Sequence, residues 1–286
     1  MLSDSIIYQS QNQFGFYTTA VKWYAAAISW RWKLFTTRSG IILFMERYSR
    51  NILIEKIGAE GQRKLLSSKV LVAGTGGLGS SVIASLASLG IGTIGLVDND
   101  NLELSNLNRQ FIHKYENIGK AKISSAQEWI NSYNPDIKVK TYKLRLDEGN
   151  CEEIIREYDI VADCFDSYKS KFMLNKACIE NKKVLVHGGV TEFFGQVMTV
   201  IPEKSACLNC LFDQTDPNSY VVKGVVSPTV NVIGSMQAME ILKILLGIDT
   251  VLIDSFLSYD GINQRFQKIR VDKKQACSVC GVKSPV

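Results

Sequence analysis

Short apolar runs alternate along the chain with longer segments in which apolar residues recur every three or four positions. The first pattern predicts buried strands and the second predicts helices with one buried face. The predicted strands are residues 70–73, a run ending at Asp98, 138–146, 160–165, 184–190, 196–202, 251–259 and 264–271. The predicted helices are a segment ending at Leu66, one beginning near Gly77, and residues 120–133, 151–158, 170–181 and 230–246.

Regular alternation of strands and helices predicts a doubly wound, mostly parallel, Rossmann-like α/β sheet with helices on both faces. The last two strands have no helix between them, so we expect them to form an antiparallel extension of that sheet. At 286 residues the chain is near the upper limit for one hydrophobic core. We therefore expect one domain over residues 45–286, preceded by an extension over 1–44.

A glycine cluster follows the first strand and opens the first helix of this alternation. Gly74, Gly76 and Gly79 fit G-x-G-x-x-G, and the predicted helix begins at Gly77. Such a turn lets backbone N–H groups approach phosphate oxygens, and the helix dipole adds positive potential. Asp98 closes the second strand, where a carboxylate can accept hydrogen bonds from ribose hydroxyls. The segment therefore predicts a nucleotide site.

The glycine cluster alone leaves NAD, FAD and ATP open, as well as a turn that binds nothing. The residues after Asp98 favour ATP, because Arg109, Lys120 and Lys122 follow closely, together with Asn106 and Gln110. Arginine can hold phosphate oxygens bidentately, and lysine neutralises them as a point charge. The alternative for any one of these residues is an exposed basic helix face.

Acidic residues at the strand ends are candidates for a metal ion. Asp166 follows the strand predicted at 160–165, on the sheet edge where doubly wound folds bind ligands. Its carboxylate could hold Mg²⁺ against ATP phosphates. The alternative is a helix N-cap, and the two roles do not exclude each other. Asp100 and Asp163 could also line the site, with lower priority.

The cysteines divide into two pairs and three isolated residues. Cys207 with Cys210, and Cys277 with Cys280, form two C-x-x-C pairs that together predict a tetrahedral zinc site with four cysteine ligands. Neither pair is expected to open a helix after a strand, which argues against a thioredoxin-like redox role. The isolated thiols lie on apolar faces and are expected in the core; they are Cys151, Cys164 and Cys178. We interpret His113 and His187 as structural.

Charge and composition limit the classes of partner. The net charge is +5, of which residues 1–44 carry +3, so the rest of the chain is not a basic nucleic-acid binder. Residues 1–44 also carry Trp23, Tyr24, Trp30 and Trp32, but no apolar stretch long enough to span a bilayer. This segment is either an amphipathic membrane-surface helix or a disordered or non-native extension, and we favour the second. An odd number of cysteines and no clean signal peptide point to a reducing cytoplasm.

The stretch D-N-D-N-L-E-L-S-N-L-N-R-Q at 98–110, with G-K-A-K at 119–122, resembles the MoeB/ThiF/HesA group. These proteins are bacterial relatives of ubiquitin-activating enzymes. The resemblance runs from about Glu46 to Gly281. It implies an ATP-dependent adenylyltransferase that activates the C-terminal glycine carboxylate of a small ubiquitin-like sulfur-carrier protein, MoaD-like for molybdopterin or ThiS-like for thiamine biosynthesis.

The resemblance also implies roles for particular residues. Asp98 matches the ribose ligand of the family, Arg109 and Lys122 match its phosphate ligands, and Asp166 matches its magnesium ligand. Arg50 matches an arginine that reaches across a homodimer to the phosphates of the partner subunit. The nucleotide-binding set expected from the residues and the resemblance is Gly74, Gly76, Gly77, Gly79, Asp98, Asp100, Asn106, Arg109, Gln110 and Lys122.

The chain departs from the family at one position. Many members have a cysteine, usable for a thioester or persulfide, where this chain has Tyr220. We therefore expect the reaction to stop at the acyl-adenylate, which an external sulfurtransferase would receive. Two other classes of function stay open: a Rossmann-type NAD/FAD oxidoreductase and a non-catalytic carrier-binding scaffold.

Overall fold

The computed structural model describes residues 46–212, 216 and 223–281. The chain divides by its internal contacts into Met1–Arg50 and Asn51–Val286, and the second unit carries the sheet. The extension predicted over residues 1–44, and Tyr220, lie outside the described residues.

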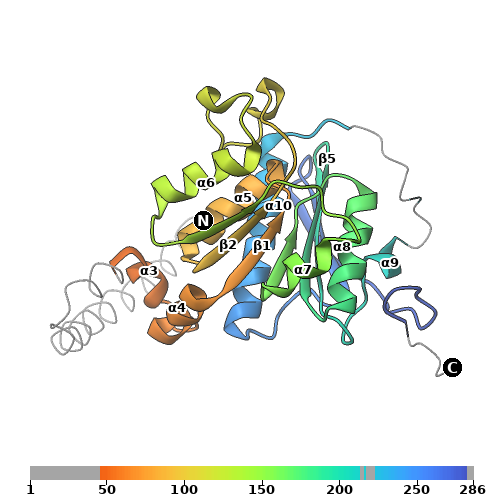
Figure 1. Ribbon diagram of the computed structural model, residues 1–286. Helices are drawn as coiled ribbons and strands as arrows, with labels where there is room; N and C mark the ends of the chain where they lie inside the picture. Colours follow the sequence, from red (N-terminus) through yellow and green to blue (C-terminus); the bar gives the residue numbers. More distant parts are fainter. Residues whose placement is uncertain (1–45, 213–215, 217–222, 282–286) are drawn as a thin grey trace, which may run out of the picture. The chain divides into compact units, whose positions relative to one another are not determined.

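The helices and strands follow the predicted alternation (Figure 1). The strands are β1 (Lys69–Ala73), β2 (Thr93–Val97), β3 (Lys138–Tyr142), β4 (Ile160–Asp163), β5 (Val184–Thr191), β6 (Phe194–Val200), β7 (Ser255–Asp260) and β8 (Arg265–Arg270). The helices are α3 (Ser49–Ile52), α4 (Gly58–Ser67), α5 (Gly77–Leu89), α6 (Lys122–Tyr133), α7 (Cys151–Arg156), α8 (Tyr168–Glu180), α9 (Leu208–Leu211) and α10 (Ser227–Leu246). Two 3₁₀ turns, η2 (Leu104–Asn106) and η3 (Tyr115–Asn117), lie between β2 and α6.

One eight-stranded sheet runs in the order β3-β2-β1-β4-β5-β6-β7-β8. The first five strands in this order are parallel, and the last three add antiparallel pairs. The strand order reverses between β1 and β4, which pair in parallel up to Ala73 opposite Asp163. Ligands of doubly wound folds bind at such a reversal. The predicted fold class and the antiparallel extension are confirmed.

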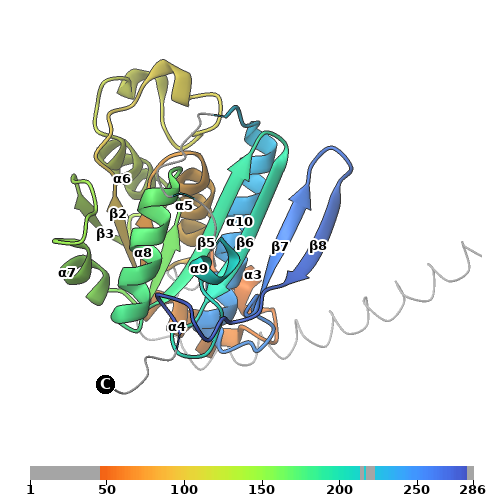
Figure 2. The same ribbon diagram turned by 90° about the vertical axis from the view of Figure 1, so that its right-hand side faces the viewer.

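Side chains of β1 alternate between two apolar layers, as expected for a strand buried on both faces. Val70 and Val72 pack with α5, α6 and α10, whereas Leu71 and Ala73 pack with α7 and α8. Figure 2 shows α8 and α10 on opposite faces of the sheet. The turns that leave the carboxyl ends of β1 and β4 are thereby fixed by packing from both sides.

Several predicted boundaries shift in the structure. The strand expected from residue 251 begins only at Ser255, because Leu252 enters the core without strand pairing and donates its N–H to Glu240. The strand expected to reach residue 146 ends at Tyr142. Helix α10 starts at Ser227 rather than 230, since Pro228 fits the first turn of a helix. It ends, as predicted, at Gly247, which has a φ of +72°.

Helix α10 is long and apolar enough to cross a membrane by length and composition, with a mean hydropathy of 1.3. Its buried residues, however, pack on α5, β5 and β6 within the larger apolar layer. Val230, Ile233 and Ile241 are fully or almost fully buried there. Among the described residues this helix is therefore a core element of the sheet domain.

Candidate functional site

The glycine turn after β1 is built by close backbone approaches that exclude a Cβ. Gly74 has a φ of +97°, and a Cβ on it would lie 2.9 Å from the carbonyl oxygen of Cys164, just after β4. A Cβ on Gly79 would lie 2.1 Å from the carbonyl oxygen of Gly74. The turn is thus pressed against the end of β4 on one side and against α5 on the other, as a dinucleotide-type glycine turn requires.

The N-terminus of α5 leaves this turn without a side-chain cap. Gly76 is the N-cap residue, and it supplies no side-chain acceptor for the first N–H groups of the helix. A Cβ on Gly77 would lie 3.0 Å from Val230 of α10, so the helix end is held close to its neighbour. Unpaired N–H groups at a helix N-terminus form a site for an anion such as phosphate.

Asp98 lies at the carboxyl end of β2 and links two loops of the site. Its Oδ2 accepts hydrogen bonds from the Thr75 backbone N–H at 2.8 Å and from the Thr75 hydroxyl at 3.0 Å. Its Oδ1 accepts one from the Asp100 N–H at 2.9 Å. The half-buried carboxylate is therefore held beside the glycine turn and keeps lone pairs for a further donor, such as a ribose hydroxyl.

The two cations expected to bind phosphates have different neighbours: Arg109 lies beside the glycine turn, and Lys122 pairs with Asp100. The Arg109 stem runs past Gly77, whose Cβ would lie 3.6 Å from Cγ of Arg109, and the guanidinium donates to Ser105 and Asn108. Lys122 is buried at the start of α6 and donates from Nζ to Asp100 at 2.7 Å. Asp100 therefore links the two residues: its carboxylate accepts from Lys122, and its backbone N–H donates to Asp98.

Two polar side chains of the same motif are buried but differ in their partners. Asn106 accepts from the Glu103 N–H at 3.0 Å within a reciprocal capping box of η2. Gln110 is 3% exposed and its amide nitrogen would lie 3.5 Å from a Cβ on Gly76. Its Oε1 is buried with no partner among the described residues. Asn106 thus shapes the loop, whereas Gln110 faces the glycine turn directly.

Asp166 is exposed in the turn between β4 and α8. The alternative role of N-cap belongs to its neighbour, because the Ser167 hydroxyl accepts from the Ser170 N–H at 3.3 Å. The backbone of this turn touches the glycine turn at Cys164 and Phe165. Asp166 is therefore exposed in a turn next to the reversal of strand order.

A buried charged cluster lies directly behind that turn, and the sequence interpretation missed most of it. Asp163 is fully buried and accepts from Lys171 Nζ at 3.2 Å and from His187 Nδ1 at 2.7 Å. Lys171 also donates to the Gly188 carbonyl at 2.7 Å, and Asp163 accepts from the Phe165 N–H at 3.1 Å. The cluster fixes the backbone that carries Asp166.

The ionisation of this cluster follows from its contacts. Burial raises the pKa of Asp163, but the Lys171 ammonium and the His187 hydrogen bond outweigh it and leave the pKa below its usual value. Burial and the same ammonium lower the pKa of His187. Burial likewise lowers the pKa of His113. Asp163 is thus ionised and both histidines are neutral at pH 7, consistent with structural roles for the histidines.

The four paired cysteines come together in the structure as predicted. Their sulfurs all lie within 4.8 Å of one another, with 3.7 Å between Cys207 and Cys277 and 3.4 Å between Cys210 and Cys280. Four sulfurs bound to one zinc ion at about 2.3 Å lie about 3.8 Å apart. The donor set and its spacing therefore fit zinc. Despite partial burial, which raises it, N–H groups of Cys280 and Val279 lower the pKa of Cys277 to about 7.

One expectation about these cysteines is wrong. Cys207 is the N-cap of α9, so the first pair does open a helix, although that helix has only four residues. The facing pair, Cys277 and Cys280, lies on a loop after β8. The argument against a redox role therefore cannot rest on the absence of a helix. It rests instead on the meeting of all four thiols in one cluster, as a zinc site requires. Cys151, Cys164 and Cys178 are buried core thiols, as expected.

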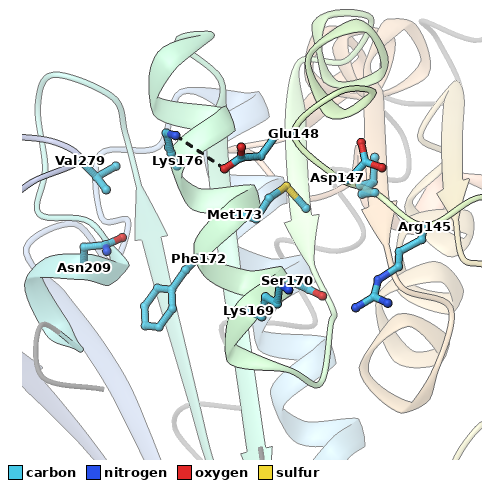
Figure 3. A pocket seen from close by; sticks show the side chains of 11 residues that line it. Arg145, Asp147, Glu148, Lys169, Ser170, Phe172, Met173, Lys176, Asn209 and Val279 are labelled. Atoms are coloured by element: carbon cyan, nitrogen blue, oxygen red, sulfur yellow. Dashed lines mark ion pairs between the residues drawn. The ribbon is translucent and has the colours of Figure 1, made fainter. Parts of the chain in front are cut away.

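A pocket of about 450 Å³ lies along α8 and contains none of the predicted nucleotide ligands (Figure 3). An ion pair between Lys176 and Glu148, 3.7 Å apart, crosses its rim. Its lining residues are Arg145, Leu146, Asp147, Glu148, Lys169, Ser170, Phe172, Met173, Lys176, Asn209 and Val279. The glycine turn, Asp98, Arg109 and Lys122 do not line this pocket, so the pocket is separate from the predicted nucleotide site.

Two remaining predictions concern Arg50 and Tyr220. Arg50 is exposed on α3 and belongs to the separate unit Met1–Arg50. The chain around Tyr220 lies outside the described residues, but one of its described flanks contacts β5 and the other contacts the turn after β5. The Phe212 ring lies 6.3 Å from the His187 ring, and Glu192 forms an isolated bridge with Val225.

Comparisons with known proteins agree with this geometry. The model of the ThiF family matches residues 48–280. Over 248 residues the chain is 40% identical to the adenylyltransferase and sulfurtransferase MOCS3 of Dictyostelium discoideum, covering 85% of this chain but only 58% of that protein. It is 37% identical over 246 residues to the sulfur carrier protein adenylyltransferase of Thermus thermophilus, covering 83% of this chain and 91% of that protein.

Solved structures share the fold. The crystal structure of Escherichia coli MccB with AMPCPP and MccA matches with a TM-score of 0.74 and 26% identity, over 82% of this chain and 74% of that chain. The expected family relationship is thereby confirmed, and the fold places the glycine turn and the strand reversal in a known architecture.

Proposed function

The chain belongs to the ThiF family, and from this premise we propose that it adenylates the C-terminal carboxylate of a small ubiquitin-like sulfur-carrier protein with ATP. The relatives from Dictyostelium discoideum and Thermus thermophilus are both named as adenylyltransferases. The observation that carries the proposal is the convergence of an uncapped helix N-terminus, the Asp98 carboxylate and two cations on one glycine turn.

The residues of the turn suit an in-line attack by a carboxylate on the α-phosphorus of ATP. Pyrophosphate leaves, and the product is an acyl-adenylate with AMP joined to the carrier. No enzyme nucleophile is needed, so catalysis rests on positioning and on charge neutralisation. Asp98 would orient the ribose, while Arg109 and Lys122 would balance charge on the phosphates. Lys122 would then share its ammonium between Asp100 and a phosphate oxygen.

Magnesium belongs to the proposal through Asp166. The carboxylate is exposed in a turn whose backbone touches the glycine turn, and hard carboxylate oxygens are the ligands that Mg²⁺ prefers. The ion would neutralise charge on the leaving pyrophosphate. Zinc at the four cysteines would have a separate, structural role, because all four of its ligand positions are filled by thiolates.

We further propose that the working form is a homodimer with shared sites. In the family resemblance, the arginine at position 50 reaches the phosphates of the partner subunit. Arg50 is exposed on α3, as a side chain that reaches another subunit must be. We place the protein in the cytoplasm, where reduced thiols can hold zinc. Molybdopterin and thiamine biosynthesis are the two pathways that the family relationship proposes for its carrier.

The proposed reaction stops at the acyl-adenylate. Cys164 and Cys178 are buried, and burial raises their pKa values well above the usual range. The four paired thiols are gathered in the zinc cluster, and Cys151 is 1% exposed. A thiolate at the surface is what a thioester needs. The activated carrier would therefore pass to an external sulfurtransferase.

Carrier-dependent exchange between ATP and labelled pyrophosphate tests the proposal. Arg109→Ala and Lys122→Ala should each lower the exchange rate about 100-fold or more, because each removes charge stabilisation at the reacting phosphates. Lys114→Ala is the matched control. It removes an exposed lysine five residues from Arg109 that pairs with Glu116 at 3.4 Å, and it should leave exchange within about twofold.

Near-normal exchange by both alanine variants would show that the assignment of the phosphate site is wrong. ATP binding without exchange in the presence of any ubiquitin-like carrier would favour a non-catalytic scaffold. Tight binding of NAD or FAD in place of ATP would favour an oxidoreductase. Circular dichroism of each variant separates loss of activity from loss of fold.

A further inference from the structure

His113 joins the glycine turn to α6 through two hydrogen bonds in the interior. Its Nε2 lies 3.0 Å from the carbonyl oxygen of Thr75, inside the turn. Its Nδ1 lies 3.0 Å from the hydroxyl of Ser125, on α6. The ring is 6% exposed, so both contacts are shielded from water. Nothing in the sequence indicates this pairing, because Thr75 and His113 are far apart along the chain.

The partners determine which ring nitrogen carries the proton. A carbonyl oxygen can only accept, so Nε2 must donate its N–H to Thr75. Nδ1 therefore accepts from the hydroxyl of Ser125, whose oxygen in turn accepts from the Asn117 amide at 3.0 Å. In this series of hydrogen bonds, from Asn117 through Ser125 and His113 to Thr75, every donor has an acceptor. Burial lowers the pKa of His113, which keeps the ring in this single neutral tautomer at pH 7.

Thr75 is held at three of its polar atoms. Its N–H and its hydroxyl both donate to Asp98, and its carbonyl accepts from His113. The described residues contain no cis peptide, so the bond between Thr75 and Gly76 is trans. In a trans peptide the C=O and the N–H point in opposite directions. A carbonyl directed at His113 thus directs the Gly76 N–H away from it.

The Gly76 N–H has no acceptor among the described residues. It is one of the backbone donors at the uncapped N-terminus of α5. A Cβ on Gly76 would meet only the Gln110 amide within 4 Å, so the space beside this residue is open. Successive backbone N–H groups that face one open space bind anions.

We propose that His113 is a positioning residue that directs the Gly76 N–H at a phosphate of the bound nucleotide. The inference rests on the proposed ATP site, but it assigns a role to a residue that contacts neither nucleotide nor carrier. His113 acts through one peptide plane. Without its Nε2–H, the Thr75 carbonyl loses its partner and the peptide can rotate, which turns the Gly76 donor out of line.

The test compares two substitutions that differ in one donor. His113→Leu removes both ring nitrogens. His113→Gln keeps an amide N–H near the position of Nε2, which can still donate to Thr75. Asn134→Leu is the matched control: it deletes a buried side-chain donor to a backbone carbonyl, that of Ala87, 3.1 Å away at the other end of α5. Calorimetry measures the dissociation constants of ATP and of adenosine with magnesium and without carrier.

We expect His113→Leu to bind ATP about tenfold more weakly, because a backbone donor to a charged group is lost. Its affinity for adenosine should stay within about twofold, since adenosine has no phosphate. His113→Gln should recover most of the ATP affinity, and Asn134→Leu should retain it. Unchanged ATP affinity in His113→Leu overturns the inference, and so does an equal loss for ATP and adenosine, which would indicate a packing role.

A measurement on the unmodified protein keeps the inference testable if a variant does not fold. Nitrogen-15 NMR of the histidine ring should show the Nε2–H tautomer for His113, and an Nδ1–H tautomer would overturn the inference. Failure of the proposed function looks different. If the unmodified protein binds no ATP at all, the nucleotide site itself is wrong, whatever the tautomer of His113.

Discussion

The parallel half of the sheet and its antiparallel extension are stabilised in different ways. In β1 every residue after Lys69 is buried, and helices cover both faces. In β8 five of the six residues are exposed, and the chain after it carries Cys277 and Cys280. The parallel half thus rests on apolar layers and on buried polar groups. At the end of the extension, the cluster of four cysteine sulfurs connects the segment after β8 to α9.

The candidate nucleotide site and the cysteine cluster lie in different parts of the sheet. The candidate nucleotide site depends on backbone that two apolar layers hold in place, and none of its residues belongs to the cysteine cluster. The cluster instead joins α9 to the loop after β8 across a long sequence interval, which a small, exposed β-ribbon cannot do with apolar contacts alone. Cys207 and Cys210 nevertheless lie in the same apolar layer as Leu71 and Ala73 of β1, so three experiments test how far the two regions are independent.

The largest effect should follow loss of the metal. Cys210→Ser should release about one zinc ion per chain, since three thiolates no longer complete a tetrahedron. Apparent zinc-binding free energies of such sites are on the order of 10 kcal/mol, so the segment after β8 should lose its protection against proteolysis. Elemental analysis and limited proteolysis measure both changes, while the ATP dissociation constant should change less than about twofold.

The control for zinc loss is Cys178→Ala, which removes a buried thiol outside the cluster and should retain the metal. A metal-free unmodified protein would contradict the zinc assignment. A large loss of ATP affinity in Cys210→Ser would instead show that the two regions are coupled.

A smaller effect is expected from the buried charges of the parallel half. Lys171→Met leaves Asp163 ionised in the interior without its ammonium partner, which should lower the free energy of unfolding by about 3–5 kcal/mol. Lys169→Met, on the first turn of the same helix, should change it by less than about 0.5 kcal/mol. Urea unfolding followed by circular dichroism compares the two. Equal effects would mean that the cluster contributes nothing specific.

The smallest effect concerns pH and also belongs to the parallel half, which holds both histidines of the chain. Their folded-state pKa values lie below 6.5, so below about pH 6.5 the unfolded chain binds protons that the folded chain does not. Stability must then fall as the pH falls, by up to about 1.4 kcal/mol per pH unit for each histidine. The lowered pKa of Asp163 continues this loss at more acidic pH.

Urea unfolding between pH 7.5 and about 5.5 measures the slope. His113→Gln should reduce it, because the substituted side chain does not titrate. The charged groups that act on the rings are Lys122 and Asp98 for His113, and Lys171 and Asp163 for His187. A slope unchanged by the substitution would show that His113 takes up its proton equally well in the folded protein.

The sequence predicted those features that depend on local pattern. Strand and helix periods led to the mostly parallel sheet and its extension, and the spacing of Gly74 and Gly79 matched the backbone contacts that exclude a Cβ. The two C-x-x-C pairs led to the cysteine cluster. Each of these patterns lies within a few neighbouring residues. The two cysteine motifs are far apart in sequence, but their identical C-x-x-C spacing indicated that they bind one ion together.

What the sequence could not indicate depends on tertiary contacts. Asp163 is buried because it ends β4 and pairs with Lys171 of α8. Asp166 is exposed because it lies in the turn between β4 and α8. One signal was present: Lys171 shares a helix face with Leu174 and Cys178, where a lysine is unexpected without a buried acid. Nothing local links His113 to Thr75, since only folding brings them together.

The anchoring of the chain on both sides of Tyr220 has a consequence for how this fold can diversify. Phe212 contacts His187 of β5, and Val225 bridges to Glu192 in the turn after β5, so both flanks are held on neighbouring parts of the chain. When the ends of a segment are fixed, closing it costs only about 0.6 kcal/mol more for each doubling of its length. Insertions there would be tolerated at little thermodynamic cost. None of the predicted phosphate ligands lies in that interval, so its length can change while those residues stay in place.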